Sequence, residues 1–216
     1  MITLRYFELL AIASFLTLRL AAQTTANAGP DVNPPAKAWE ASVTVDGYLV
    51  PHAEFYVSPT IAADHGWLHL EGRYNYEDQK TGSLWFGVNL NAGNTLALRV
   101  TPMIGGVFGN TTGVAPGCEI SLSYKRLEFY SALEYVFDTK DRSGSFFYSW
   151  PQLTYSPREW LHFGIVAQRT KAYQTDLDVQ RGVFGGVSYK KINFTTYVFN
   201  AGWTDPTVVL EVVYRR

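Results

Sequence analysis

Alternation of apolar and polar residues is the dominant pattern in the chain. In residues 67–77, WLHLEGRYNYE, polar side chains stand at odd positions from His69 to Asn75, and apolar or small side chains stand at even positions. A repeat of two residues is that of an extended strand with two chemically different faces. The pattern recurs, and we expect strands at 38–46, 53–63, 67–77, 83–91, 95–104, 117–125, 127–138, 146–156, 160–171, 177–189, 192–201 and 207–215.

The connections between these segments alternate in length. Those after every second segment are tight, at 64–66, 92–94, 125–126, 157–159 and 190–191, whereas the others are mostly longer and polar. The longest predicted loop is GGVFGNTTGVAPG, at 105–117. After the first segment the connection is ambiguous, because Asp46-Gly47 is a hairpin signal and Pro51 cannot donate to a strand ladder. Short turns on one rim and longer loops on the other are typical of membrane barrels.

The apolar face must meet either a protein core or lipid. Twelve strands closed around an apolar interior would leave a lumen wider than side chains can fill, since about eight strands is the size that they just fill. Apolar side chains that face outward would instead meet lipid, and segments of about 9 to 11 residues can cross a bilayer. We therefore expect an all-β fold, a closed antiparallel up-and-down transmembrane β-barrel of about twelve strands. A two-sheet sandwich with an apolar centre is the alternative.

Aromatic residues near the segment ends fit the same picture. In a membrane barrel they would form girdles at the two bilayer interfaces. The candidates for these girdles are Trp39, Tyr76, Tyr124, Phe137, Tyr155, Tyr189 and Tyr214.

The N-terminal region has the features of a secretory signal. Arg5 precedes an apolar run at 9–18, and Ala26-Asn27-Ala28 fits a cleavage site. We expect a signal peptide at 1–28, a Pro-rich lead at 29–37 and a barrel domain at 38–216. Cleavage after Ala22 and retention of this segment as an amphipathic helix are the alternatives.

The amino-acid composition argues against several other classes of protein. Aromatic residues make up 15% of the chain and charged residues 17%, below the roughly 25% of ordinary soluble domains. A formal net charge of −1 argues against nucleic-acid binding, and the single Cys118 cannot form an internal disulfide. No apolar stretch beyond the N-terminal region is long enough for a transmembrane helix.

Three stretches carry a resemblance to a known class of protein. YNYED at 74–78, TPMIGGVFG at 101–109 and FFYSWPQLTYSP at 146–157 resemble bacterial outer-membrane β-barrel proteins filed as porins or as uncharacterised outer-membrane proteins. The resemblance is architectural and implies a location in the bacterial outer membrane but no specific solute. It also implies recognition by the insertion machinery, although here Tyr214 is followed by Arg215 and Arg216 rather than ending the chain.

The alternate strand positions that carry polar side chains supply the candidate functional residues. Acidic residues outnumber basic residues at these positions, and Asp178 is one further acidic residue. We therefore expect a narrow, weakly cation-preferring channel for small solutes. Pairs of Glu71 or Glu134 with Arg73 or Arg99 that cross-link a plugged interior are the alternative. The expected lumen-lining residues are Glu40, Glu54, His69, Glu71, Arg73, Arg99, Glu119, Glu128, Glu134, His162 and Glu211.

A lipid hydrolase is a further candidate, because His69 and His162 share the inward parity with Ser121, Ser123 and Ser188. No local nucleophile signature accompanies them, and His65 and His69 on a strand and turn need not converge on a metal. We expect no enzymatic activity, no cofactor and no metal site. A structural or surface-adhesive barrel is the other alternative, to be distinguished by whether the predicted loop 105–117 folds into the lumen or projects outward.

Three basic residues, Arg169, Lys171 and Arg181, depart from the outward apolar pattern. They lie near the segment ends that we assign to the extracellular rim, where charge costs little. We expect Arg169 and Arg181 to contact phosphates of lipopolysaccharide, unless they belong to the adjoining loop.

Overall fold

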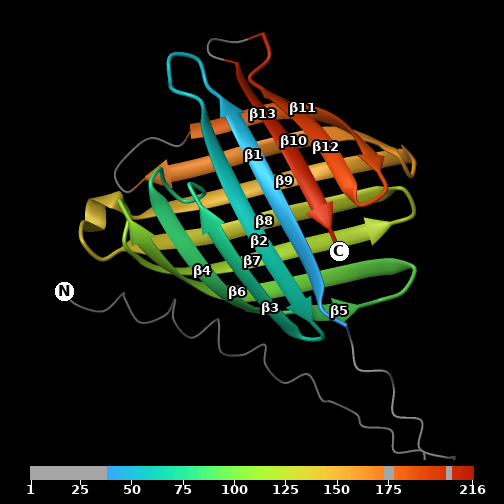
Figure 1. The fold of residues 1–216 in the computed structure, drawn as a ribbon, viewed down its shortest axis with the longest axis horizontal. Helices are drawn as coiled ribbons and strands as arrows, with labels where there is room; N and C mark the ends of the chain where they lie inside the picture. Colours follow the sequence, from blue (N-terminus) through green and yellow to red (C-terminus); the bar gives the residue numbers. More distant parts are fainter. Residues whose placement is uncertain (1–37, 173–177, 203–205) are drawn as a thin grey trace, which may run out of the picture. The chain divides into compact units, whose positions relative to one another are not determined.

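The computed structural model describes residues 38–172, 178–202 and 206–216, which leaves the predicted signal peptide and Pro-rich lead outside the described residues. Its helical content in these ranges is the 3₁₀ turn η1 (Arg142–Gly144), and none of it is long enough to span a membrane. The described strands (Figure 1) are β1 (Glu40–Leu49), β2 (Tyr56–His65), β3 (Leu68–Tyr74), β4 (Thr81–Val88), β5 (Leu90–Ala92), β6 (Leu96–Gly109), β7 (Gly113–Tyr124), β8 (Leu127–Asp138), β9 (Phe146–Arg158), β10 (Leu161–Ala172), β11 (Asp178–Tyr189), β12 (Ile192–Phe199) and β13 (Thr207–Arg215).

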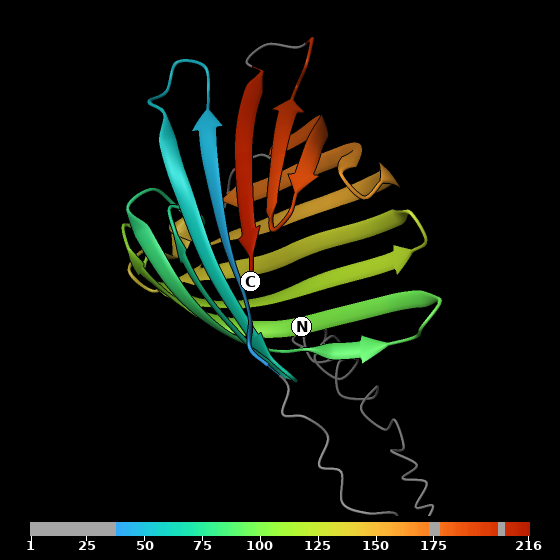
Figure 2. The same ribbon diagram turned by 45° about the vertical axis from the view of Figure 1, so that its right-hand side comes forward.

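These strands close into a ring in which every pairing is antiparallel. Strands that follow one another along the chain pair, except β4 and β5. In addition, β1 pairs with β13 and β4 pairs with β6. The short β5 continues the line of β4 beyond Asn89 and pairs with β6, so the thirteen described strands occupy twelve positions in the ring. Figure 2 shows β1 and β13 side by side in the ring. The predicted closed barrel of about twelve strands is confirmed.

Turn lengths alternate around the ring as the sequence predicted. The tight connections 66–67, 93–95, 125–126, 159–160 and 190–191 form one edge of the barrel, which we call the short-turn rim. The opposite edge, the long-loop rim, carries the described connections 50–55, 75–80, 110–112 and 139–145. The barrel begins and ends at the short-turn rim, where Ala41 and Arg216 exchange two backbone hydrogen bonds of 3.3 and 2.8 Å.

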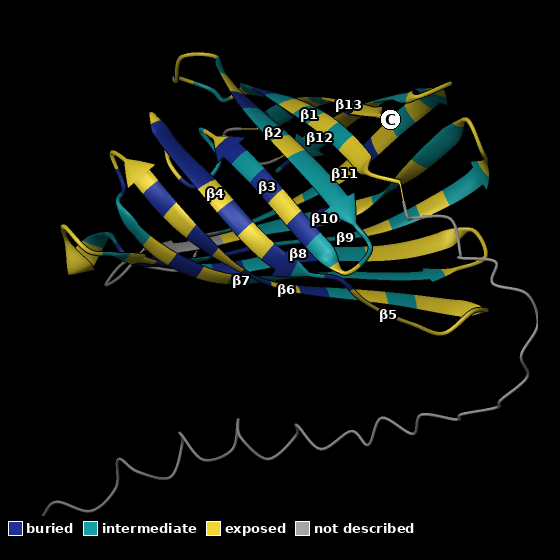
Figure 3. Ribbon diagram, turned by 60° about the horizontal axis from the view of Figure 1, so that its bottom comes forward, coloured by how far each residue is buried: buried dark blue, intermediate teal, exposed yellow. Residues whose placement is uncertain are grey.

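Burial alternates along the strands, as the striped colouring of β3 and β4 in Figure 3 shows. The side chains on the exposed face of the strands are apolar, with Leu84 66% exposed and both Ile61 and Ile165 60% exposed. Polar side chains such as Ser58, Thr101 and Glu134 are buried on the inward parity. The barrel is thus apolar outside and largely polar inside, the reverse of a soluble sandwich.

The predicted loop 105–117 is wrong, because β6 continues to Gly109 and β7 begins at Gly113. Its glycines make room for an inward indole ring. A Cβ added at Gly105 would lie 2.5 Å from Trp85, and one at Gly117 would lie 3.0 Å from it. Glycine here marks close packing inside a strand rather than a turn.

The ends of two other predicted strands also shift. Asp46 and Gly47 lie within β1 instead of forming a hairpin, and a Cβ on Gly47 would meet the Phe55 ring at 3.1 Å. The segment predicted at 67–77 ends as a strand at Tyr74, because Asn75 adopts a left-handed φ of 56°.

The aromatic girdle forms with one exception. Trp39, Tyr124, Phe137, Tyr155, Tyr189 and Tyr214 are exposed side chains near strand ends. Tyr76 instead packs inside the barrel against Tyr148, with ring centroids 5.5 Å apart. The chain leaves β3 before reaching Tyr76, so strand parity no longer decides which way this residue faces.

A pair of adjacent glycines tests the inward packing. Gly105→Val would collide with Trp85 and should destabilise the barrel by about 1–3 kcal/mol, the usual effect of overpacking. Gly106→Val is the matched control, since a Cβ there meets nothing within 4 Å. Urea unfolding in lipid vesicles should separate the two variants, and equal midpoints would contradict the packing of Trp85 against Gly105.

Candidate functional site

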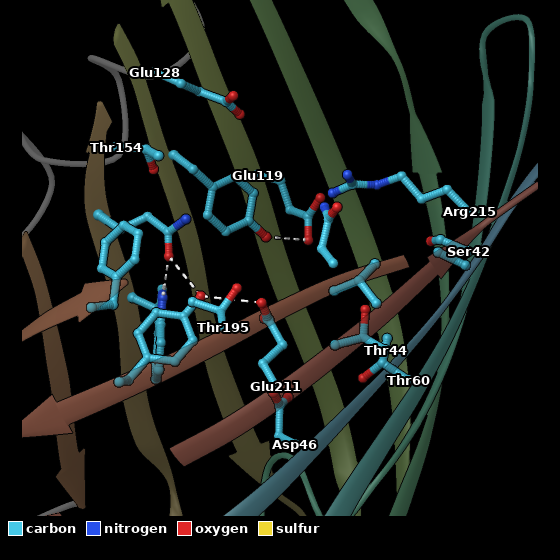
Figure 4. A pocket seen from close by; sticks show the side chains of 18 of the residues that line it. Ser42, Thr44, Asp46, Thr60, Glu119, Glu128, Thr154, Thr195, Glu211 and Arg215 are labelled. Atoms are coloured by element: carbon cyan, nitrogen blue, oxygen red, sulfur yellow. Dashed lines mark hydrogen bonds between the residues drawn. The ribbon is translucent and has the colours of Figure 1, made fainter. Parts of the chain in front are cut away.

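The inward side chains enclose a polar cavity of about 560 Å³. Its walls include hydroxyls from β1, β2, β9 and β12 and carboxylates from β1, β7, β8 and β13. Figure 4 labels ten of the lining residues, which are Ser42, Thr44, Asp46, Thr60, Glu119, Glu128, Thr154, Thr195, Glu211 and Arg215.

Most residues expected in the lumen lie inside the barrel. The cavity wall includes His69, Glu71, Arg73, Arg99, Glu119, Glu128, His162 and Glu211. Glu134 is buried beside Arg73 without lining the cavity. Glu40 is exposed at the start of β1, and Glu54 is exposed in the connection 50–55, because β2 begins only at Tyr56. Asp178 begins β11.

A buried guanidinium ties three carboxylates together inside the barrel. Arg73 donates from Nε to Glu71 Oε1 at 2.8 Å and from Nη1 to Glu134 Oε2 at 2.7 Å. Its Nη1 also lies 3.6 Å from Glu77 Oε1. Because β3 and β8 lie four positions apart in the ring of twelve, the contact with Glu134 bridges part of the interior between strands that do not pair.

Two aromatic rings hold this guanidinium in place. The Arg73 Cζ atom is 4.3 Å from the centroid of Tyr76 and 4.5 Å from that of Trp85. The Trp85 indole N–H donates to Glu77 Oε1 at 3.1 Å, so the ring that stacks on Arg73 also binds one of its carboxylates. Cation–π contacts gain strength when desolvated, which suits this site.

A second polar network lies closer to the short-turn rim. His69 Nδ1 is 2.9 Å from Asp64 Oδ1, and His69 Nε2 is 3.3 Å from Glu71 Oε2. Asn89 donates to Asp64 at 2.5 Å and accepts from Thr101 at 2.8 Å. Asn89 is the residue between β4 and β5, so the break in that strand places a polar side chain inside the barrel.

The long-loop half of the interior is filled by apolar side chains. One buried cluster comprises Trp85, Met103, Val107, Ala115, Val136, Phe146 and Tyr148, and a second comprises Val166, Phe184, Tyr197, Phe199 and Val209. Trp150 packs against both. We call these thirteen residues together the aromatic layer. Since Tyr148, Trp150, Phe184 and Tyr197 also line the cavity, the layer forms its inner end.

Carboxylates dominate the charge of the cavity. Among the described residues that line it, seven are carboxylates and three are arginines. Asp46 and Glu211 are directly opposed in the β1–β13 register and both line the cavity. Like charges in this arrangement destabilise a sheet unless a cation or solvent lies between them.

Sequence reasoning missed several inward residues. Asp46 ends the predicted strand 38–46 at a connection that the sequence leaves ambiguous, and it is not among the expected lumen-lining residues. The aromatic side chains of the inner layer were not separated from those of the outer girdle. A signal existed in FFYSW at 146–150, where Phe146, Tyr148 and Trp150 share the inward parity. Aromatics on the same parity as polar residues indicate a packed lumen, which strand periodicity alone does not distinguish from a wet one.

Arg169 and Arg181 both lie near the long-loop rim and are exposed. Each shares the outward parity of its strand with an exposed apolar residue, Ile165 in β10 and Val183 in β11. The Arg181 backbone N–H donates to Asn200 Oδ1 at 3.3 Å. This is the geometry that contact with lipid phosphates would require, and such contact remains a prediction.

The residues proposed for hydrolysis do not assemble into a catalytic unit in the described structure. His162 Nε2 is 3.0 Å from Thr195 Oγ1, and neither histidine has a hydrogen bond to Ser121, Ser123 or Ser188. Ser121 instead contacts Glu128 at 3.4 Å. The described residues also hold no group of three or more His, Cys, Asp or Glu side chains placed to bind a metal ion.

The fold resembles that of known outer-membrane channels. No protein-family model matches the sequence, and no curated protein matches it. The KdgM porin superposes with a TM-score of 0.57 at 11% identity, over 80% of this chain and 98% of that one. The same porin in complex with disordered oligogalacturonate gives 0.57 at 10% identity, over the same shares of both chains.

An outer-membrane protein with a longer chain also aligns, with a lower score. The outer membrane protein opdK from Pseudomonas aeruginosa gives a TM-score of 0.44 at 10% identity, over 85% of this chain and 67% of that one. At 10–11% identity the two KdgM comparisons establish the fold alone, which is that of an outer-membrane-type β-barrel.

Removing the buried guanidinium tests the inner network. Arg73→Met leaves buried carboxylates without their cation and should destabilise the barrel by about 3–5 kcal/mol. Adding Glu71→Gln and Glu134→Gln should recover much of the loss. Arg99→Met is the matched control, since Arg99 is exposed and its hydrogen bond is to Asn91 at 3.1 Å. If both arginine variants unfold at the same urea concentration in vesicles, the network does not stabilise the fold.

Proposed function

We propose that this protein is an outer-membrane barrel that provides a narrow, weakly cation-preferring passage for small solutes. The observation that carries the proposal is the inverted distribution of side chains. Apolar residues cover the outside of a closed ring, while a polar cavity of about 560 Å³ lies inside it. A surface of this kind suits hydrocarbon, and a wet lumen serves polar solutes.

The charge of the cavity supports a preference for cations. Seven carboxylates against three arginines among the described lining residues give the wall a negative potential, which concentrates cations and repels anions. The oligogalacturonate bound by the KdgM porin is a polyanion, so this wall is unsuited to it. We therefore propose a different class of solute, small and uncharged or cationic.

The aromatic layer sets the width of the passage. It occupies the long-loop half of the described interior, where Phe199 and Val136 are fully buried. Passage through this half requires movement of side chains such as Trp150, so we expect small conductance steps. A structural barrel without transport is the second candidate, and the packing of this layer favours it. The predicted loop 105–117 was expected to distinguish a channel from a structural barrel, but the connection there has only three residues. The packing of the aromatic layer is therefore the feature that distinguishes them.

Contacts with the surroundings complete the proposal. Lipid would face the apolar exterior, and Arg169 and Arg181 would reach the phosphates of lipopolysaccharide. The insertion machinery would read β13, in which Val208, Leu210, Val212 and Tyr214 alternate with inward residues.

Planar-bilayer recordings test cation preference directly. In a salt gradient the reversal potential of the wild type should indicate that cations carry most of the current. Asp46→Asn with Glu211→Gln should reduce that preference by removing two opposed carboxyl groups from the wall. Glu54→Gln is the control, because Glu54 is exposed in the connection 50–55. Current carried mainly by anions in the wild type would contradict the proposal.

Widening the inner layer tests passage itself. Trp150→Ala with Tyr197→Ala removes two rings whose centroids are 5.3 Å apart and should enlarge each conductance step. Leu84→Ala, an outward-facing change, should leave the steps unaltered. If neither the wild type nor the double variant conducts while both remain folded, the structural barrel is the better description.

A further inference from the structure

The short-turn rim carries its positive charge on one side. Six basic residues with no place in the cavity wall lie on two tight turns, at the end of β9 and after β13, and they are Lys125, Arg126, Arg158, Lys190, Lys191 and Arg216. The two turns connect β7 to β8 and β11 to β12, and Arg158 adjoins the turn from β9 to β10 between them, so the set follows consecutive strands of the ring up to β13. We call this set of six residues the basic arc.

Backbone hydrogen bonds hold the parts of the basic arc next to one another. The Arg126 carbonyl accepts from the Ser156 N–H at 2.9 Å, which joins the first turn to β9. The Trp160 carbonyl accepts from Ser188 at 2.9 Å, and the Lys191 carbonyl accepts from Arg215 at 3.0 Å. Successive turns are therefore separated by two strand spacings, roughly 10 Å, along a continuous edge.

The cations of the basic arc have no ion-pair partner in the described part of the chain. All six residues are exposed, and none takes part in a salt bridge between described residues. One acidic residue, Glu159, lies next to Arg158 in the turn between β9 and β10. The rest of the rim differs, because Glu40, Asp64 and His65 lie at the adjoining ends of β1 and β2.

Aromatic rings line the outer surface directly beside these cations. Tyr124, Trp160 and Tyr189 are exposed next to the turns, as are Tyr155 and Tyr214 on the adjoining strands. Lys125 Nζ lies 5.1 Å from the Tyr124 ring centroid, and Lys190 Nζ lies 5.2 Å from that of Tyr189. Tyrosine and tryptophan favour the headgroup level of a bilayer, so these ammonium groups lie at that level too.

The backbone conformation at two lysines of the basic arc is one that glycine adopts more readily. Lys125 and Lys190 adopt left-handed φ angles of 55° and 56°. Two other turns of the same rim use glycine for this conformation, at Gly66 with φ 64° and Gly93 with φ 78°. A side chain in this region costs conformational energy that glycine avoids. Lysine is therefore present at two positions where the backbone alone would favour glycine.

We propose that the basic arc binds the phosphate groups of anionic phospholipids in the leaflet at the short-turn rim. The cations are unpaired, regularly spaced and level with an aromatic girdle, which is the arrangement that attracts acidic headgroups. A soluble acidic partner would use the charges and leave the exposed rings in lipid unexplained. The proposal requires that the barrel lies in a bilayer and does not depend on whether it conducts.

Quenching of Trp160 by brominated lipids tests the proposal. In a background with Trp39→Phe, Trp67→Phe and Trp203→Phe, Trp160 reports on lipid beside the basic arc, while Trp85 and Trp150 lie inside the barrel. In mixed vesicles, brominated phosphatidylglycerol should associate about tenfold more strongly than brominated phosphatidylcholine. The preference should fall towards onefold at 1 M salt.

Matched charge removal supplies the control. Arg126→Gln, Lys190→Gln and Lys191→Gln together should reduce the preference to about twofold. Lys80→Gln, Lys140→Gln and Arg142→Gln remove the same residue types from the long-loop rim, including one left-handed lysine, and should leave it unchanged.

Two results would overturn the proposal. One is equal quenching by both lipids in the wild type, and the other is an equal loss of preference in the two triple variants. If the lipids quench equally but wild-type vesicles bind soluble polyglutamate and the Arg126/Lys190/Lys191 variant does not, the basic arc serves a soluble acidic partner instead.

Discussion

The placement of the apolar strand face on the outside of a closed ring determines the rest of this structure. Hydrocarbon offers no hydrogen bonds, so every backbone N–H and C=O in a membrane must find its partner within the protein. Pairing of β1 with β13 and of β4 with β6 removes the free edges that an open sheet would leave. The polar parity must then face inward, and twelve strands enclose more space than a dry core of side chains would fill.

Side chains occupy that inner space differently in the two halves of the barrel. Towards the long-loop rim the aromatic layer fills it with packed side chains, whereas towards the short-turn rim the walls remain polar around a cavity. Arg73 lies at the boundary, where it contacts cavity-lining Glu71 and buried Glu134 and stacks on Trp85. A single guanidinium thereby links the polar network to the packed layer.

Much of the fold could be predicted because a repeat of two residues depends only on local geometry. The outward parity of Leu84, Ile61 and Ile165 follows from the sequence alone, and so does the inward parity of Arg73 and Glu71. Contacts between strands distant in sequence could not be predicted in this way. Gly105 resembles a turn residue until Trp85 is seen against it, and Tyr76 resembles a girdle residue until β3 is seen to end before it. Which inward residues touch depends on ring closure, and periodicity contains no information about that.

Accessibility of cysteines to a water-soluble maleimide tests most directly whether the apolar face meets hydrocarbon. In a Cys118→Ser background reconstituted into lipid vesicles, cysteine at outward-facing Leu84 or Ile165 should resist labelling until detergent is added. Cysteine at Thr44, in the wall of the polar cavity, should react without detergent. Rapid labelling at Leu84 and Ile165 together with protection at Thr44 would mean that the apolar face meets water, which would contradict a barrel whose outer surface lies in lipid.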